Sequence, residues 1–271
     1  MADTIFHIIL VTLPVAYTLL LLGYAKLFLK QASPLADKSR LLLAVTLVVH
    51  VGAMILRGVE VQGCPMGRYP EFLSLLAVSM AVTYFVLESR TGERSTGVFM
   101  IGLVLLTQIV ATVSILVAEG PGSYPEGMWE SLHVFAAIVG YSAVVVASLY
   151  GLLYLFLYTC IKRGRFGRFY QNMPSLEILT RLNFVAATVG FVALSVTLGV
   201  GVILWQRGVE IHFLQPEVLL TVVLWCLYGL SVTAHRVLRI GGKKLAYSTL
   251  LGILIVIGFV VGIAATNEFH G

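Results

Sequence analysis

Residues 96–117 read TGVFMIGLVLLTQIVATVSILV, a run of 22 positions without a charged side chain. An α-helix rises about 1.5 Å per residue, so about 20 apolar residues cross the hydrocarbon core of a bilayer. Arg90 and Arg94 precede the run and Glu119 follows it. The stretch therefore predicts a membrane-spanning helix whose charged flanks lie in water.

The rest of the chain repeats this pattern. Further spans are predicted at residues 5–29, 40–59, 70–88, 129–160, 177–205, 215–237 and 245–266. Only 11% of the 271 residues are charged, whereas a soluble domain carries about 25%. A soluble globule is excluded. We expect an all-α, polytopic transmembrane helix bundle of about eight helices, forming one domain over residues 1–271.

Basic residues are distributed very unevenly between the two ends of the predicted helices. Fifteen of the 18 Lys and Arg residues fall at one end, and only Arg57, Arg68 and Arg207 fall at the other. The positive-inside rule assigns the basic end to the cytoplasm, so both termini are expected outside. The net charge of +5 thus reports topology, and without a basic stripe it predicts no nucleic-acid partner. We expect a multi-pass protein of a bacterial inner (cytoplasmic) membrane.

The histidines suggest what such a bundle could bind. Neutral imidazole is a common axial ligand of haem iron, and a six-coordinate iron needs two imidazoles from different helices at similar depth. His133 and His270 form such a pair at the outer end, with His212 as a competitor, and His50 with His235 is the inner candidate pair. For each intramembrane histidine, a hydrogen bond to a neighbouring helix is the alternative. Without a Cys-x-x-Cys-His motif, the haem would be non-covalent haem b.

Four outer side chains are candidates for the remainder of a haem site. Arg57, Arg68 and Arg207 are the only outer cations, and a guanidinium can pair with a haem propionate. Trp129 lies one helical turn before His133, where it could stack on a porphyrin. The alternatives are an arginine that extends toward the interface and a tryptophan of the interfacial belt. We assign no catalytic residue.

Four short motifs occur in a fixed order along the chain. They are residues 63–71 (GCPMGRYPE) after Arg57, 129–134 (WESLHV) followed by Gly140 and Tyr141, 174–177 (PSLE) followed by Gly190-Phe191 and Leu198-Gly199, and Trp225, Tyr228, His235-Arg236 with 269–271 (FHG). In this order they resemble the cytochrome c assembly membrane proteins, the CcsA, CcmC and HemX-like group, which bind and pass haem across bacterial and plastid membranes. The resemblance implies that His133 and His270 are the outer axial pair. It also implies that His50 and His235 correspond to intramembrane histidines.

The loop before the seventh span departs from this pattern. Family synthases carry a tryptophan-rich loop there that ends in an Asp-Pro-Lys-Glu run, whereas residues 205–217 read WQRGVEIHFLQPE. The shortened loop places the chain nearer to the HemX-like relatives.

The sequence therefore predicts a protein that handles or translocates haem for cytochrome c assembly. Its expected partners are the lipid bilayer, haem, and another membrane or periplasmic assembly protein or an apocytochrome. Two alternatives remain: a b-type electron-transfer subunit with two haems on the same four histidines, and a transporter or regulatory scaffold without haem.

Overall fold

The computed structural model describes residues 2–30, 33–63, 65, 69–117, 127–210 and 214–268; for 2–5, 7, 115–117 and 259–268 it describes the backbone alone. These described residues form ten helices and no strand. The helices are α1 (Ala2–Phe28), α2 (Pro34–Asp37), α3 (Ser39–Glu60), α4 (Tyr69–Thr91), α5 (Gly97–Val117), α6 (Met128–Lys162), α7 (Arg168–Asn172), α8 (Leu176–Gln206), α9 (Pro216–Val237) and α10 (Gly242–Glu268). The prediction of an all-α fold is confirmed.

Eight of the helices are long, and each overlaps one of the predicted spans. Seven helices in the described part of the chain are long and apolar enough to cross a membrane. The eighth long helix, α10, has 27 residues, which corresponds to about 40 Å. With 35 and 31 residues, α6 and α8 are longer than a bilayer requires. The protein is a polytopic membrane bundle.

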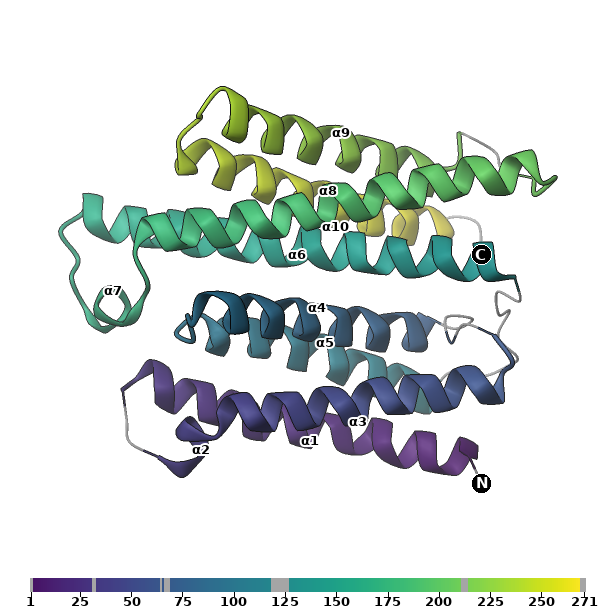
Figure 1. Ribbon diagram of the computed structural model, residues 1–271, viewed down its shortest axis with the longest axis horizontal. Coiled ribbons are helices and arrows are strands. Elements are labelled where there is room, and N and C mark those ends of the chain that lie inside the picture. Colours follow the sequence, from purple (N-terminus) through teal and green to yellow (C-terminus); the bar gives the residue numbers. More distant parts are fainter. Residues whose placement is uncertain are drawn as a thin grey trace.

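The long helices form two groups of four (Figure 1). Helices α1, α3, α4 and α5 make the N-terminal group, and α6, α8, α9 and α10 make the C-terminal group, with α4 packed on α6 between them. Because successive long helices run in opposite directions, α1 begins and α10 ends at the same end of the bundle. We call this the outer end, following the charge distribution, and the opposite end the inner end.

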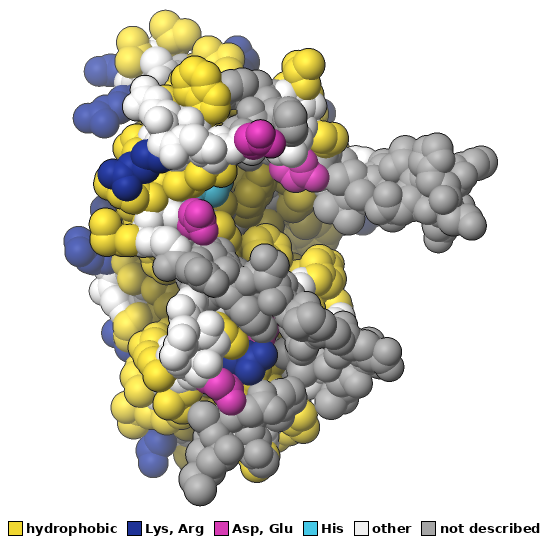
Figure 2. Space-filling view, turned by 90° about the vertical axis from the view of Figure 1, so that its right-hand side faces the viewer, with side chains coloured by type: hydrophobic (Ala, Val, Ile, Leu, Met, Phe, Trp, Pro, Cys, Tyr) yellow, Lys and Arg dark blue, Asp and Glu magenta, His cyan; other side chains and the backbone are white. Residues whose placement is uncertain are grey.

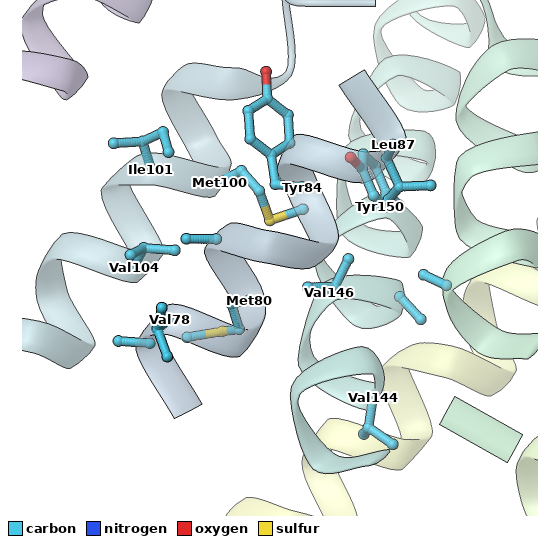
Figure 3. Packing of buried hydrophobic residues seen from close by; sticks show 14 of the residues in the cluster. Val78, Met80, Tyr84, Leu87, Met100, Ile101, Val104, Val144, Val146 and Tyr150 are labelled. Carbon is cyan, nitrogen blue, oxygen red and sulfur yellow. The ribbon is translucent and has the colours of Figure 1, made fainter. Parts of the chain in front are cut away.

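The core lies where the two groups meet. Figure 3 shows side chains of α4, among them Met80 and Tyr84, between those of α5 and α6. Met100 of α5 and Val146 and Tyr150 of α6 are also fully buried there. By contrast, Val48 is 73% and Leu254 62% exposed on helices that pass through the membrane. Such side chains are suited to contact with lipid, since backbone polar groups are already paired within the helix.

An aromatic cluster ties the two groups together at the inner end. Phe169 of the short helix α7 lies 4.5 Å from Phe156 of α6, measured between ring centroids. It also lies 6.3 Å from Phe28 of α1 and 5.9 Å from Phe99 of α5. The connection after α6 is therefore anchored on both groups. It leads into α8, where the Ser175 side chain caps the helix by accepting a hydrogen bond from the Ile178 amide.

Candidate functional site

The outer end of the bundle is hollowed. Figure 2 shows this end face-on, where hydrophobic side chains line a hollow and a histidine side chain lies in its wall. Here the start of α6 packs against the end of α8, which runs in the opposite direction. This antiparallel pairing brings the half-buried His133, in the second turn of α6, beside Thr197 and Gly201 of α8.

The hydrogen bond of His133 defines which ring nitrogen carries the proton. Nδ1 lies 3.0 Å from the carbonyl oxygen of Thr197. A carbonyl oxygen only accepts, so Nδ1–H must donate, and a neutral ring then keeps a lone pair on Nε2. Among the described residues, no side chain or backbone group bonds to that Nε2. Iron-ligating histidines use the same arrangement, in which one nitrogen is held by the protein and the other faces the metal.

Gly201 makes room for the ring. A Cβ atom built on Gly201 would lie 3.4 Å from Cε1 and 3.6 Å from Nδ1 of His133. The imidazole therefore packs on the bare backbone of α8, one helical turn beyond the carbonyl that holds it. The Thr197 carbonyl therefore holds the ring against the face of α8 on which Gly201 lies.

Trp129 and Arg207 lie next to this histidine on the same two helices. The Arg207 guanidinium carbon is 5.0 Å from the centroid of the Trp129 ring, a cation–π contact. Trp129 is one turn before His133 on α6, and Arg207 is the C-cap of α8. The structure thus brings together three of the predicted site residues: an imidazole, an indole and an exposed guanidinium.

Arg57 does not lie in this outer site and instead pairs with acidic side chains of the N-terminal group. Its Nε donates to Oε1 of the buried Glu71 at 2.9 Å, and its Nη1 pairs with Glu60 at 3.2 Å. The guanidinium carbon also lies 5.3 Å from the ring of Phe6. These contacts tie α1, α3 and α4 together at the outer end, so Arg57 has a structural role in the N-terminal group.

His50 lies in the middle of the N-terminal group and is completely buried. Ser74 Oγ gives its proton to Oε1 of Gln108, at 3.0 Å, so it must accept the Nε2–H of His50, at 2.9 Å. Nδ1 is then the acceptor for the Tyr17 hydroxyl, also at 2.9 Å. Both ring nitrogens are occupied, and in this arrangement neither has a lone pair for iron.

The structure does not bring His50 and His235 together. His235 lies in the last turn of α9, in the C-terminal group, and its Nδ1 donates to the carbonyl oxygen of Ile240 at 2.8 Å. Its ring packs 5.0 Å from that of Phe184. The predicted inner pair is separated because α3 packs within the N-terminal group and α9 within the C-terminal group. His235 instead holds the turn between α9 and α10.

Three further predicted residues, His270, Arg68 and the competitor His212, lie outside the described residues. The second axial ligand therefore stays a prediction from the sequence. Within the described ranges, no group of three or more His, Cys, Asp or Glu side chains could hold a metal ion.

The family pattern described as Cytochrome C assembly protein matches residues 66–265, more than half of the chain. The chain belongs to this family. The match begins after His50 and Arg57 and includes α6 to α9, with both His133 and His235.

Two curated members of this group are similar over part of their length. Protein HemX of Bacillus subtilis (strain 168) is 23% identical over 141 residues, 51% of this chain and 51% of that protein. Cytochrome c biogenesis protein CcsA of Heterosigma akashiwo, in two strains, is 30% identical over 98 residues, 35% of this chain and 30% of the alga's protein. The chain spans about half or less of the length of these relatives.

Thr197 and Gly201 complete the His133 environment, and no sequence pattern identified either residue. Thr197 contributes its backbone carbonyl, which every residue type carries, and Gly201 contributes the lack of a side chain. One member of the His50 hydrogen-bond network could be recognised in the sequence, because Gln108 is a polar amide inside the uncharged run 96–117. A buried amide is almost always hydrogen-bonded, so it could have indicated a partner on a neighbouring helix.

Proposed function

We propose that this cytochrome c assembly protein binds haem b non-covalently at its outer end, with Nε2 of His133 as one axial ligand, and handles that haem for cytochrome c assembly. The observation that carries the proposal is the hydrogen bond from Nδ1 of His133 to the Thr197 carbonyl. It fixes the tautomer of a neutral ring, so Nε2 keeps the lone pair that an iron would need. When bound, haem would place its iron at Nε2 of His133, and its apolar porphyrin ring would occupy the hollow at the outer end.

The neighbouring residues fit a porphyrin. Trp129 offers an aromatic face one turn from the ligand, and the exposed Arg207 offers a guanidinium to a propionate. His270 is the proposed second ligand on the basis of the sequence. The proposed setting is a bacterial inner membrane, and the proposed recipient is an apocytochrome or a second assembly protein.

The same geometry argues against the electron-transfer alternative. Two haems in series need a second pair of axial ligands, and the sequence offered His50 with His235. In the described residues His50 uses both nitrogens in hydrogen bonds and lies in the other helix group. A single outer site is therefore the simpler function for this bundle.

Haem binding is tested by the absorbance of the purified protein and by pyridine haemochrome quantification. Loss of a residue that hydrogen-bonds a metal-binding side chain costs about 10- to 100-fold in metal affinity. We expect His133→Ala, which removes the ligand itself, to cost at least as much. His235→Ala is the matched control, since it removes a half-buried histidine with the same Nδ1-to-carbonyl bond. Equal haem content in a folded His133→Ala protein and the wild type would refute the proposed site.

The packing of His133 on Gly201 gives a second prediction. Gly201→Leu should push the ring off the Thr197 carbonyl and reduce haem affinity about 10- to 100-fold. Gly201→Ala should leave affinity unchanged, because its Cβ would make an ordinary contact at 3.4 Å. Haem titration followed by the Soret band measures both. If the leucine and alanine variants bind alike, the glycine does not position the ligand.

A further inference from the structure

A groove opens at the inner end between the last turns of α6 and the first turns of α10. It has a volume of about 310 Å³, far more than the roughly 30 Å³ share of one water molecule. Its wall carries three cations, and the described lining contains no acidic residue. The lining residues are Leu155, Tyr158, Thr159, Lys162, Arg163, Lys243 and Tyr247.

Two tyrosines hold the central cation in place. The ammonium nitrogen of Lys243 lies 4.9 Å from the ring centroid of Tyr158 and 5.9 Å from that of Tyr247. The rings attract the cation without neutralising it, and the structure gives Lys243 no carboxylate partner among the described residues. A positive charge held in place by aromatic rings therefore lines the same groove as two exposed cations, Lys162 and Arg163.

The groove continues into the membrane along both helices. On α10, Leu251 and Leu254 follow Tyr247 at helical spacing, and they are 48% and 62% exposed. On α6, Leu152 lies one turn deeper than Leu155 and is 52% exposed. The basic side chains at the interface therefore adjoin an apolar surface that faces the hydrocarbon of the membrane.

The two helices are held close enough to keep this shape. A Cβ atom on Gly151 of α6 would lie 2.9 Å from the Ala246 carbonyl oxygen of α10. A Cβ atom on Gly242 would overlap with Oγ1 of Thr180 on α8. The start of α10 is therefore packed tightly on α6 and α8, and the groove is part of a rigid contact.

We propose that this groove binds the phosphate of an anionic phospholipid of the inner leaflet, whose acyl chains run along Leu152 and Leu251. Basic pockets between transmembrane helices on the cytoplasmic side suit such headgroups. The cations would pair with the phosphate, and the tyrosines fit the interfacial level. The shared chemistry, a phosphate group, could also come from free phosphate, and the apolar continuation favours the lipid.

Native mass spectrometry of the purified full chain in detergent, with added phosphatidylglycerol, tests the proposal. Each interfacial cation contributes roughly a fivefold change in binding, so Arg163→Gln with Lys243→Gln should lower lipid retention by roughly 25-fold. The matched control is Arg181→Gln with Arg236→Gln, which removes two exposed inner cations outside the groove. It should retain lipid like the wild type.

Three results would overturn the proposal. An equal loss of phosphatidylglycerol in both double variants would indicate that the lipid is attracted to the basic inner end in general and not to the groove. Equal retention of phosphatidylcholine would remove the role of net charge, and displacement of phosphatidylglycerol by equimolar inorganic phosphate would assign the groove to free phosphate. An unchanged unfolding temperature of the groove variant in lipid-free detergent would show that altered folding does not cause the loss.

Discussion

Glu88→Ala is expected to destabilise the bundle by roughly 2–4 kcal/mol. The Glu88 side chain is fully buried, and it receives hydrogen bonds from the Tyr24 hydroxyl at 2.5 Å and from Nε of Arg40 at 2.9 Å. Arg94 is also paired with it, at 3.3 Å. Removing one partner of a fully buried ion pair costs about 3–5 kcal/mol. The expected loss is smaller because the Arg40 side chain is 44% exposed and can be hydrated.

The measurement is the unfolding midpoint in detergent, followed by tryptophan fluorescence. Glu60→Ala is the matched control: its carboxylate is 29% exposed, and its partner Arg57 keeps Glu71. Exposed pairs contribute about 0–1 kcal/mol, so this variant should unfold close to the wild type. Glu88→Gln should fall between the two, since its amide oxygen still accepts hydrogen bonds. If Glu88→Ala and Glu60→Ala unfold at the same temperature, the Glu88 cluster does not stabilise the N-terminal group.

His50→Ala is expected to cost roughly 2–4 kcal/mol of stability and to leave the proposed haem occupancy unchanged. The substitution leaves the buried Tyr17 hydroxyl without its acceptor, which costs about 1–3 kcal/mol. It also opens a cavity at a fully buried position. Stability would fall because α1, α3 and α4 lose the side chain that joins them.

The experiment compares His50→Ala with His235→Ala in two assays, detergent unfolding and haem content per folded protein. His235 is half-buried with one hydrogen bond, so its loss should cost only about 1 kcal/mol. A folded His50→Ala protein that has lost its haem would make His50 a ligand and would contradict the hydrogen-bonded role described above.

The helices were predictable from the sequence, and their neighbours were not. Residues 96–117 appear as a helix because 22 residues without charge satisfy a length set by the bilayer. Hydropathy along one chain, however, contains no information on which helix packs against which. The pairing of His50 with His235 failed for that reason: both lie within predicted spans, but α3 and α9 pack in different groups.

The candidate site was predictable in part. His133, Trp129 and Arg207 were identified because an imidazole, an indole and a rare outer cation occur at one membrane level. The Thr197 carbonyl that determines the His133 tautomer was not identified, because every residue type carries a backbone carbonyl. Arg57 was identified by its scarcity, yet its pairing with Glu71 and Glu60 depends on how α3 meets α4.

The Phe169 cluster has a mechanical consequence. It fastens α7 to α1 and α5 on one side and to α6 on the other, and α7 lies at the inner end (Figure 1). Any rotation of one helix group against the other that preserves the cluster must pivot there. Displacement then grows with distance from the pivot, over roughly 50 Å for the 35 residues of α6. The widest opening would fall at the outer mouth beside His133.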